Sequence, residues 1–339
     1  MAIDSHKIVL DPYDYRPARF EDMPGVQKML EAIAAQQPDS YAPALEDVQR
    51  DFADPWCDPV TDTRVAVLAD GSVAGYVRVM VNPEPVGAAR AYLDDDIHPA
   101  HRNQGLEEAL LDWLEARASE RLRAMAAANP DHRPLVMRLG CWDTEHDRIA
   151  RYERRGFQPV RYFYRMRRDL RQPIPDRPLL AGLMLRTYHP ELDERMPRTF
   201  NESFSDGWSF EPVPPNDWQQ FFVQCSSFRP DLSFAVLDGD EVAAISMNRF
   251  DPAQAQRTGF RAGWIGSLGT RRAWRKRGLA SALLVASLRA FQAAGLEYAG
   301  LGVDSENPSG AVGLYEHLGF VPYSRSVTFK KVVDGSSDA

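Results

Sequence analysis

The sequence predicts an α/β protein (α+β in some classification schemes) made of two tandem domains, each a mixed central sheet with helices on both faces. The chain has 339 residues, which suits two domains of about 100–200 residues each. Two ten-residue segments, RNQGLEEALL from Arg102 and RKRGLASALL from Arg275, are near copies. In both halves strand-like segments alternate with helix-like segments in the same order, which favours a mixed sheet covered by helices.

The similarity between the two halves extends well beyond these segments. Four blocks recur in the same order and at a nearly constant separation, as expected for a duplicated domain and not for a solenoid. The matched pairs are Arg16 and Arg186 (170 residues apart), Ala66 and Ala235 (169), Arg102 and Arg275 (173), and Tyr152 and Tyr315 (163).

A proline-rich stretch, DLRQPIPDRPLLAG, separates the two copies. Its prolines restrict φ and remove backbone donors, so it is typical of a stiff, extended linker. We therefore expect an N-terminal domain at 1–168, a linker at 169–182, a C-terminal domain at 183–333 and a disordered tail at 334–339.

Each half is expected to contain the same elements in turn. The turns in AVLADG and AVLDGD suit tight hairpins. The expected elements are a first strand ending near Arg16 or Arg186, a helical region, a hairpin at 66–80 or 233–250, a fourth strand at 89–97 or 263–270, a helix from the repeated segment, a fifth strand at 134–140 or 298–303, a helix holding Tyr152 or Tyr315, and a last strand at 160–168 or 323–331.

Composition and charge narrow the range of functions. A net charge of −8 disfavours binding to nucleic acid or an anionic membrane surface. The three cysteines are far apart and odd in number, so we expect no disulfide framework and no metal site. We expect no secretory signal in the N-terminal segment, which has early acidic residues and no long apolar core. The sequence holds no apolar run of about 20 residues. We expect a cytoplasmic protein, monomeric or weakly dimeric, that acts on a small molecule.

The second repeated segment has the features of an anion site. Gly278 permits a tight turn between a strand and a helix, and the first-turn N–H groups of a helix have no internal partners. Together with the helix dipole they attract an anion. The basic side chains around this turn are Arg271, Arg272, Arg275, Lys276 and Arg277. The alternative is an ordinary glycine turn with a solvated basic cluster.

A second motif follows the first later in the same half of the chain. The residues of the two motifs are Arg275, Gly278 and Ala280, then Asn307, Pro308, Ala311, Leu314, Tyr315, Gly319 and Phe320. In this order they resemble the GCN5-related N-acetyltransferase (GNAT) family, and the tandem arrangement resembles its mycothiol synthase-like subgroup.

The resemblance implies acetyl-CoA as co-substrate and assigns roles to particular residues. Tyr315 would donate a proton to the departing CoA thiolate, which a phenol with a pKa near 10 can do; the alternative is a half-buried packing aromatic. The resemblance implies that Leu268, Gly269 and Thr270 bind the pantetheine arm and the thioester carbonyl. It implies that the loop holding the pyrophosphate consists of Arg275, Lys276, Arg277, Gly278, Leu279 and Ala280, and that Asn307 also binds the cofactor.

A general base is harder to place, because the fourth strand of the second half, GWIGSLGT, contains no carboxylate. Glu202 and Asp206 lie in NESFSDGW, in the region that forms the acceptor wall in the family. Either is a candidate base, and the alternative for each is a solvated carboxylate.

The first half departs from the motif where the donor would bind. Glu107 replaces Ala280, and a carboxylate in the first helical turn neutralises the dipole and repels a pyrophosphate. The other departures are Asp95 and Asp96 at the strand end, and Thr144, Arg148 and Arg151 in the places of Asn307, Ala311 and Leu314.

We therefore expect an acyltransferase that moves an acetyl group from acetyl-CoA to a primary amine of a small molecule by direct attack, with the C-terminal half catalytic. The alternative function is a non-catalytic acyl-CoA-binding sensor or scaffold. The identity of the amine is left open by the sequence.

Overall fold

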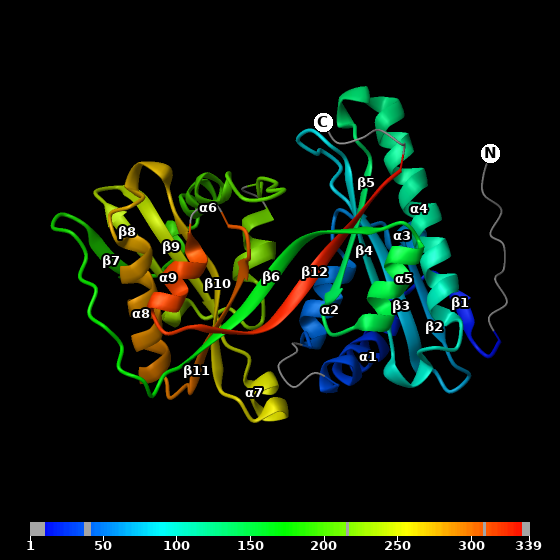
Figure 1. Cartoon of the computed structure of the whole chain (residues 1–339), viewed down its shortest axis with the longest axis horizontal. Helices are drawn as coiled ribbons and strands as arrows, with labels where there is room; N and C mark the ends of the chain where they lie inside the picture. Colours follow the sequence, from blue (N-terminus) through cyan, green and yellow to red (C-terminus); the bar gives the residue numbers. More distant parts are fainter. Residues whose placement is uncertain (1–10, 37–41, 215–216, 308–309, 334–339) are drawn as a thin grey trace. The chain divides into compact units, whose positions relative to one another are not determined.

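The structure is a computed structural model that describes residues 11–36, 42–214, 217–307 and 310–333. The chain forms two compact units (Figure 1). Unit 1 takes in the described parts of Met1–Cys141, Glu145–Val160 and Thr328–Ala339, and unit 2 those of Trp142–Thr144 and Arg161–Val327. The expected disordered tail, 334–339, lies outside the described residues.

Unit 1 contains the elements expected for the first half, together with one short helix that the sequence did not indicate, α3. Its helices are α1 (Met23–Ala35), α2 (Leu45–Phe52), α3 (Pro59–Asp62), α4 (Leu106–Ala128) and α5 (His146–Arg154). Its strands are β1 (Asp14–Arg16), β2 (Thr63–Val67), β3 (Val73–Val81), β4 (Arg90–Ile97) and β5 (Val136–Trp142), with the ends of β6 (Gln158–Asp169) and β12 (Val321–Val332).

The sheet of unit 1 has the order β1-β2-β3-β4-β5-β12. β4 and β5 are parallel, whereas β1 to β4 are antiparallel neighbours. The apolar face of α1 packs on one face of this sheet, where Met23 and Val26 meet Tyr76. α4 packs so closely on the other face that a Cβ on Gly75 would lie 2.8 Å from Leu110.

Unit 2 repeats this plan, again with one helix that the sequence did not indicate, α7. Its helices are α6 (Met196–Phe204), α7 (Pro252–Thr258), α8 (Leu279–Ala293) and α9 (Ala311–His317). Its strands are β7 (Met184–Thr187), β8 (Phe234–Asp238), β9 (Glu241–Arg249), β10 (Ala262–Thr270) and β11 (Tyr298–Asp304), with most of β6 and β12.

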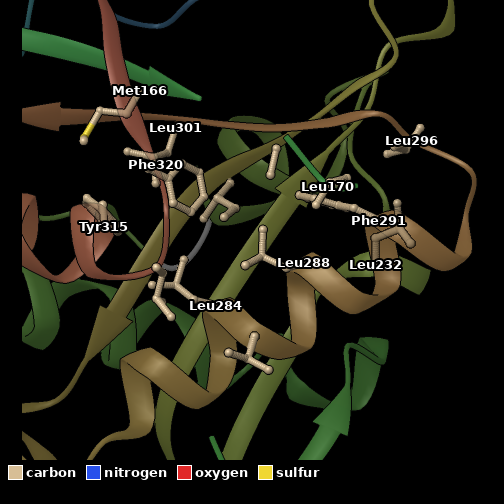
Figure 2. Close-up of a cluster of buried hydrophobic side chains, with 14 of the residues drawn as sticks. Met166, Leu170, Leu232, Leu284, Leu288, Phe291, Leu296, Leu301, Tyr315 and Phe320 are labelled. Carbon is tan, nitrogen blue, oxygen red and sulfur yellow. The ribbon is translucent and has the colours of Figure 1, made fainter. Parts of the chain in front are cut away.

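The sheet of unit 2 has the order β12-β6-β11-β10-β9-β8-β7, with β10 and β11 parallel. One face is covered by α8 and α9, whose side chains share a core with β11 (Figure 2). Leu284 and Leu288 of α8 meet Leu301 and Phe320 there. α6 covers part of the opposite face, where Met196 packs with Ile245.

The last strands of the two halves are exchanged. The strand paired with β11 is β6, from the end of the first half, with Met166 opposite Leu301. In the sheet of unit 1 the neighbour of β5 is β12, from the end of the second half. The expected division at 1–168 and 183–333 assigned each half its own last strand, and the compact units differ from it in this respect. Both strands alternate in the same way, so the sequence pattern does not distinguish the two pairings.

The mixed α/β fold with helices on both faces of each sheet is confirmed. In the described ranges no helix is both long enough and apolar enough to cross a membrane.

Candidate active site

The parallel strands β10 and β11 of unit 2 separate part of the way along. Their pairing runs from Ala262 and Tyr298 to Ile265 and Leu301. β10 continues to Thr270 alongside β9 only, and a β-bulge interrupts that ladder between Ile265 and Ser267. A bulge adds one residue and bends the strand, so main-chain groups of β10 beyond Ile265 face an opening and not a neighbouring strand.

A tight loop connects β10 to α8, and its counterpart in unit 1 has the same backbone shape. Lys276 and Asn103 both have φ of 60°. Gly278 and Gly105, which precede the two helices, have φ of 79° and 88°. The arginine before each loop also makes the same contact, because the Nε of Arg275 donates to Thr270 at 3.2 Å and that of Arg102 to Ile97 at 3.3 Å. The two loops differ in side chains and not in backbone shape.

The basic residues of the unit 2 loop divide into two groups. Arg271, Arg272 and Arg275 all make ion pairs with carboxylates, and Arg271 is also buried. Lys276 and Arg277 are exposed and have no ion pair or hydrogen bond within the described ranges. The loop therefore presents two free cations next to the N-terminus of α8, which is a suitable arrangement for a pyrophosphate.

The buried hydroxyl groups of Thr270 and Ser203, near the end of β10, have no hydrogen-bond partner among the residues that the structure describes. Buried polar groups are nearly always paired, so unpaired ones are typical of places where a ligand or water binds. Gly269 precedes Thr270 in β10, and a Cβ there would lie 2.8 Å from Ser203. Its missing side chain thus makes room for α6, while Leu268 packs into the core on the α8 side.

Tyr315 lies in the first turns of α9 and belongs to the core under α8 (Figure 2). Its ring packs edge-on against Phe320, with centroids 6.0 Å apart. The side chain is 8% exposed, and its hydroxyl makes no hydrogen bond to the part of the chain that the structure describes. Burial raises the pKa of Tyr315 to about 12, so the phenol keeps its proton.

Glu202 and Asp206 both contact arginines at the start of the loop that connects β10 to α8. Glu202 accepts from Arg271 at 2.7 Å, and Glu241 contacts the same guanidinium. Asp206 contacts both Arg275 and Arg272. The hydrogen bond from Arg275, with the neighbouring arginine charges, lowers the pKa of Asp206. These pairs count against proton abstraction by either carboxylate and favour a role in holding the loop.

In unit 1 the corresponding loop is capped by its own helix. Glu107 is only 6% exposed, and its Oε1 accepts from the main-chain N–H of Asn103 at 2.5 Å. Arg151 lies 3.6 Å from the same carboxylate oxygen. The carboxylate thus binds a loop amide and one cation, the two kinds of group that an anion would need at this position.

The end of β4 in unit 1 is filled as well. The hydroxyl of Tyr152 donates to the carboxylate of Asp95, 2.7–2.8 Å away, and accepts from Nε of Arg148 at 2.5 Å. Arg148 also forms an ion pair with Asp95. Tyr152 is fully buried, and burial raises its pKa well above the usual value. Its hydroxyl is therefore fully engaged, in contrast to that of Tyr315.

This cluster predicts a stability effect in unit 1. The Arg148→Ala variant should lower the free energy of unfolding by about 3 kcal/mol, since it leaves the buried Asp95 without its cation. Arg154→Ala, in the same helix, is the matched control: Arg154 is 66% exposed and lies 4.0 Å from Glu108, so its loss should cost less than about 1 kcal/mol. Urea unfolding of both variants measures the difference, and equal small losses would show that the cluster contributes nothing.

The remaining sequence-predicted residues lie near the same opening. Asn307 follows β11, and its N–H donates to Asp304 at 3.1 Å; the neighbouring Pro308 is outside the described residues. Two residues near the opening were missed by the sequence analysis, Arg249 and Trp264. They belong to no motif, and the only signal was that Met80 and Tyr92 replace them in the first half.

Comparison with known proteins agrees with this geometry. The model of the acetyltransferase (GNAT) family matches residues 26–157 and again 193–320. The chain therefore belongs to the GNAT family and is an acetyltransferase with two tandem family domains. Within the residues that the structure describes, no cluster of three or more His, Cys, Asp or Glu side chains could hold a metal ion.

Individual relatives are similar to this chain over most of its length. The mycothiol acetyltransferase of Salinispora tropica is 28% identical over 85% of this chain and 94% of its own length, and that of Salinispora arenicola is 28% identical over 78% and 79%. The crystal structure of a GCN5-related N-acetyltransferase from Sphaerobacter thermophilus has a TM-score of 0.69 and 25% identity, covering 97% of this chain and 98% of that one. A tandem GNAT protein from the clavulanic acid biosynthesis pathway shares the fold, with a TM-score of 0.67 and 17% identity over 96% of this chain and all of that one. The expected resemblance is confirmed.

Proposed function

We propose that unit 2 transfers an acetyl group from acetyl-CoA to a primary amine of a small molecule by direct attack, and that unit 1 has lost donor binding. The observation that carries this proposal is the difference between two loops of the same shape. In unit 2 no described residue binds the loop amides at 276–278 or the side chains of Lys276 and Arg277, whereas in unit 1 the carboxylate of Glu107 binds a loop amide and lies beside Arg151.

The residues of unit 2 fit acetyl-CoA on both sides of the opening. The N-terminus of α8, with Lys276 and Arg277, suits the pyrophosphate. The hydroxyl of Thr270 is buried and unpaired, which supports a polar ligand group at the end of β10. Acetyl-CoA supplies an activated thioester, whose carbonyl carbon forms the new C–N bond as its C–S bond breaks.

Two groups of the chain act on the charges that develop. Main-chain N–H groups of β10 beyond Ile265 face the opening and are donors to an oxygen that gains negative charge. Tyr315 lies on the α8 side of the opening and donates its proton to the leaving sulfur. The nitrogen that attacks the carbonyl loses its extra proton to water, and Tyr315 regains its proton from water after the thiol leaves. Glu202 and Asp206 act as positioning residues that hold Arg271, Arg272 and Arg275.

The names of the relatives support a small-molecule acceptor. The relatives that match most of this chain are named mycothiol acetyltransferases. We infer for this chain an acceptor that is likewise a small molecule and has a primary amine. The rival function is an acyl-CoA sensor without turnover, and the fourth strand without a carboxylate favours it. Tyr315 counts against it, because its hydroxyl makes no hydrogen bond to a described residue and is available as an acid.

Release of free thiol tests the proposal. The purified chain, acetyl-CoA and a panel of primary amines should give thiol at a rate that depends on the amine concentration, with one mole of N-acetylated amine formed per mole of thiol. Acetyl-CoA without amine provides the baseline. Tight donor binding without amine-dependent thiol release, over a broad panel, would favour the sensor.

A further inference from the structure

The two reactants must approach the opening of unit 2 from opposite faces of the sheet. The donor loop and Tyr315 lie on the face covered by α8 and α9. Ile265 and Leu301 point to this face and are buried beneath α8. Neighbouring residues of a strand point to opposite faces, so Trp264, Gly300 and Gly302 lie on the other face, from which the amine must come.

That second face is open at the point where the strands separate. Gly266 and Gly302, on either side of the opening, are both exposed. Trp264 lies flat across β11, because a Cβ on Gly300 would be 2.6 Å from its ring. The Trp264 ring also reaches Gly302, where a Cβ would lie 3.8 Å from it. The two exposed glycines thus leave space beside a flat aromatic surface.

An arginine without a partner borders this space. Arg249 is opposite Trp264 in the β9–β10 ladder and therefore points to the same face. Its Nε lies 3.4 Å from the position that a Cβ on Gly266 would occupy. The guanidinium is partly buried and makes no hydrogen bond or ion pair to any described residue. A second guanidinium, that of Arg165, lies against the Trp264 ring at 5.3 Å.

Several arginines of this unit pair with carboxylates, whereas Arg249 pairs with none of the described ones. Arg161 binds Asp304, and Arg271 binds Glu202. A guanidinium is a planar fork of donors that suits a carboxylate or a phosphate. In unit 1, which we propose to be inactive, the residue in the same register is Met80, opposite Tyr92. Unit 1 therefore has an uncharged side chain at the position that Arg249 occupies in unit 2.

We propose that the acceptor amine also carries an oxyanion, a carboxylate or a phosphate, which Arg249 binds beside Trp264 on the amine side of the opening. This inference rests on the proposed function and adds the chemical class of its substrate. The anion fixes the amine over the space between Gly266 and Gly302, and the nearby arginines disfavour acceptors that are only cationic.

Matched pairs of amines test the proposal. Glucosamine 6-phosphate is compared with glucosamine, and β-alanine with β-alaninamide, by thiol release with saturating acetyl-CoA. The anionic member of at least one pair should have the higher kcat/KM by about tenfold or more, the value of one charge-assisted hydrogen bond. The phosphate and carboxylate arms identify which oxyanion fits. Arg249→Gln should reduce that ratio to about one, and Arg249→Lys should keep part of it.

Arg289→Gln is the control, since Arg289 is an exposed arginine of α8 that pairs with Asp176, and its ratio should equal that of the native chain. Neutral members that react as well as the anionic ones in both pairs would overturn the inference while leaving the proposed function intact. If no amine is acetylated, the proposed function fails, and calorimetry of the same amines still decides the inference. Tighter binding of an anionic member, lost in Arg249→Gln, supports it, and its absence refutes it.

Discussion

Replacing Ala280 by glutamate should abolish acetyl-CoA binding to unit 2 without unfolding it. Unit 1 already has this arrangement, since Glu107 occupies the same position in a loop of the same backbone shape. In the Ala280→Glu variant, we expect the new carboxylate to accept the N–H of Lys276, as Glu107 does for Asn103. An anion then meets like charge at a distance where repulsion is worth about 1–4 kcal/mol, in addition to losing a hydrogen bond.

The expected result is a rise in the Kd of acetyl-CoA of about 10²-fold or more. Ala280→Gln has nearly the same shape without the charge, and its smaller effect would isolate the electrostatic part. Thermal unfolding of both variants checks that the fold is kept. A folded Ala280→Glu variant that binds acetyl-CoA like the native chain would show that the loop is not the donor site.

The second large effect is expected at Tyr315. The Tyr315→Phe variant keeps the ring that packs on Phe320 and removes only the hydroxyl. We expect kcat to fall by about 10²-fold or more, as is typical for the loss of a general acid, with little change in the affinity for acetyl-CoA. Tyr152→Phe is the matched control, and it should leave turnover unchanged because we propose no donor site in unit 1.

The pH dependence of kcat follows from the raised pKa of Tyr315. Tyr315 acts in its protonated form, and burial raises its pKa to about 12. The active form is therefore present at all lower pH values, and kcat should not decline on the alkaline side up to about pH 10. Turnover that survives in Tyr315→Phe at every pH would remove this residue from the mechanism.

Much of the fold could be predicted from the sequence, because hydrophobic periodicity and turn residues determine local structure. Every strand and helix expected in the two halves is present, and the hairpins at 66–80 and 233–250 lie where the turns predicted them. The β-bulge corresponds to one extra residue in the fourth strand of the second half. The separation of equivalent residues grows by one along the fourth strand, from 172 at Tyr92 and Trp264 to 173 at Ile97 and Thr270.

The exchange of β6 and β12 could not be predicted from the sequence, because it depends on which sheet edge each strand reaches and not on the strand's local pattern. The ion pairs of Glu202 and Asp206 were missed for a similar reason. Their arginine partners are 66–69 residues away along the chain, and only the packing of α6 on β10 brings them together. Arg249 carries no motif and becomes visible only once its ladder partner, Trp264, is known.

The number of acetyl-CoA molecules bound per chain tests the central claim most directly. Titration calorimetry of the native chain should give one site, and the same titration of Ala280→Glu should give none, since we propose that the only donor site lies at the N-terminus of α8. Two sites in the native chain, or one site that persists in Ala280→Glu and disappears only when the unit 1 loop is altered at Gly105, would contradict the assignment of the donor site to unit 2.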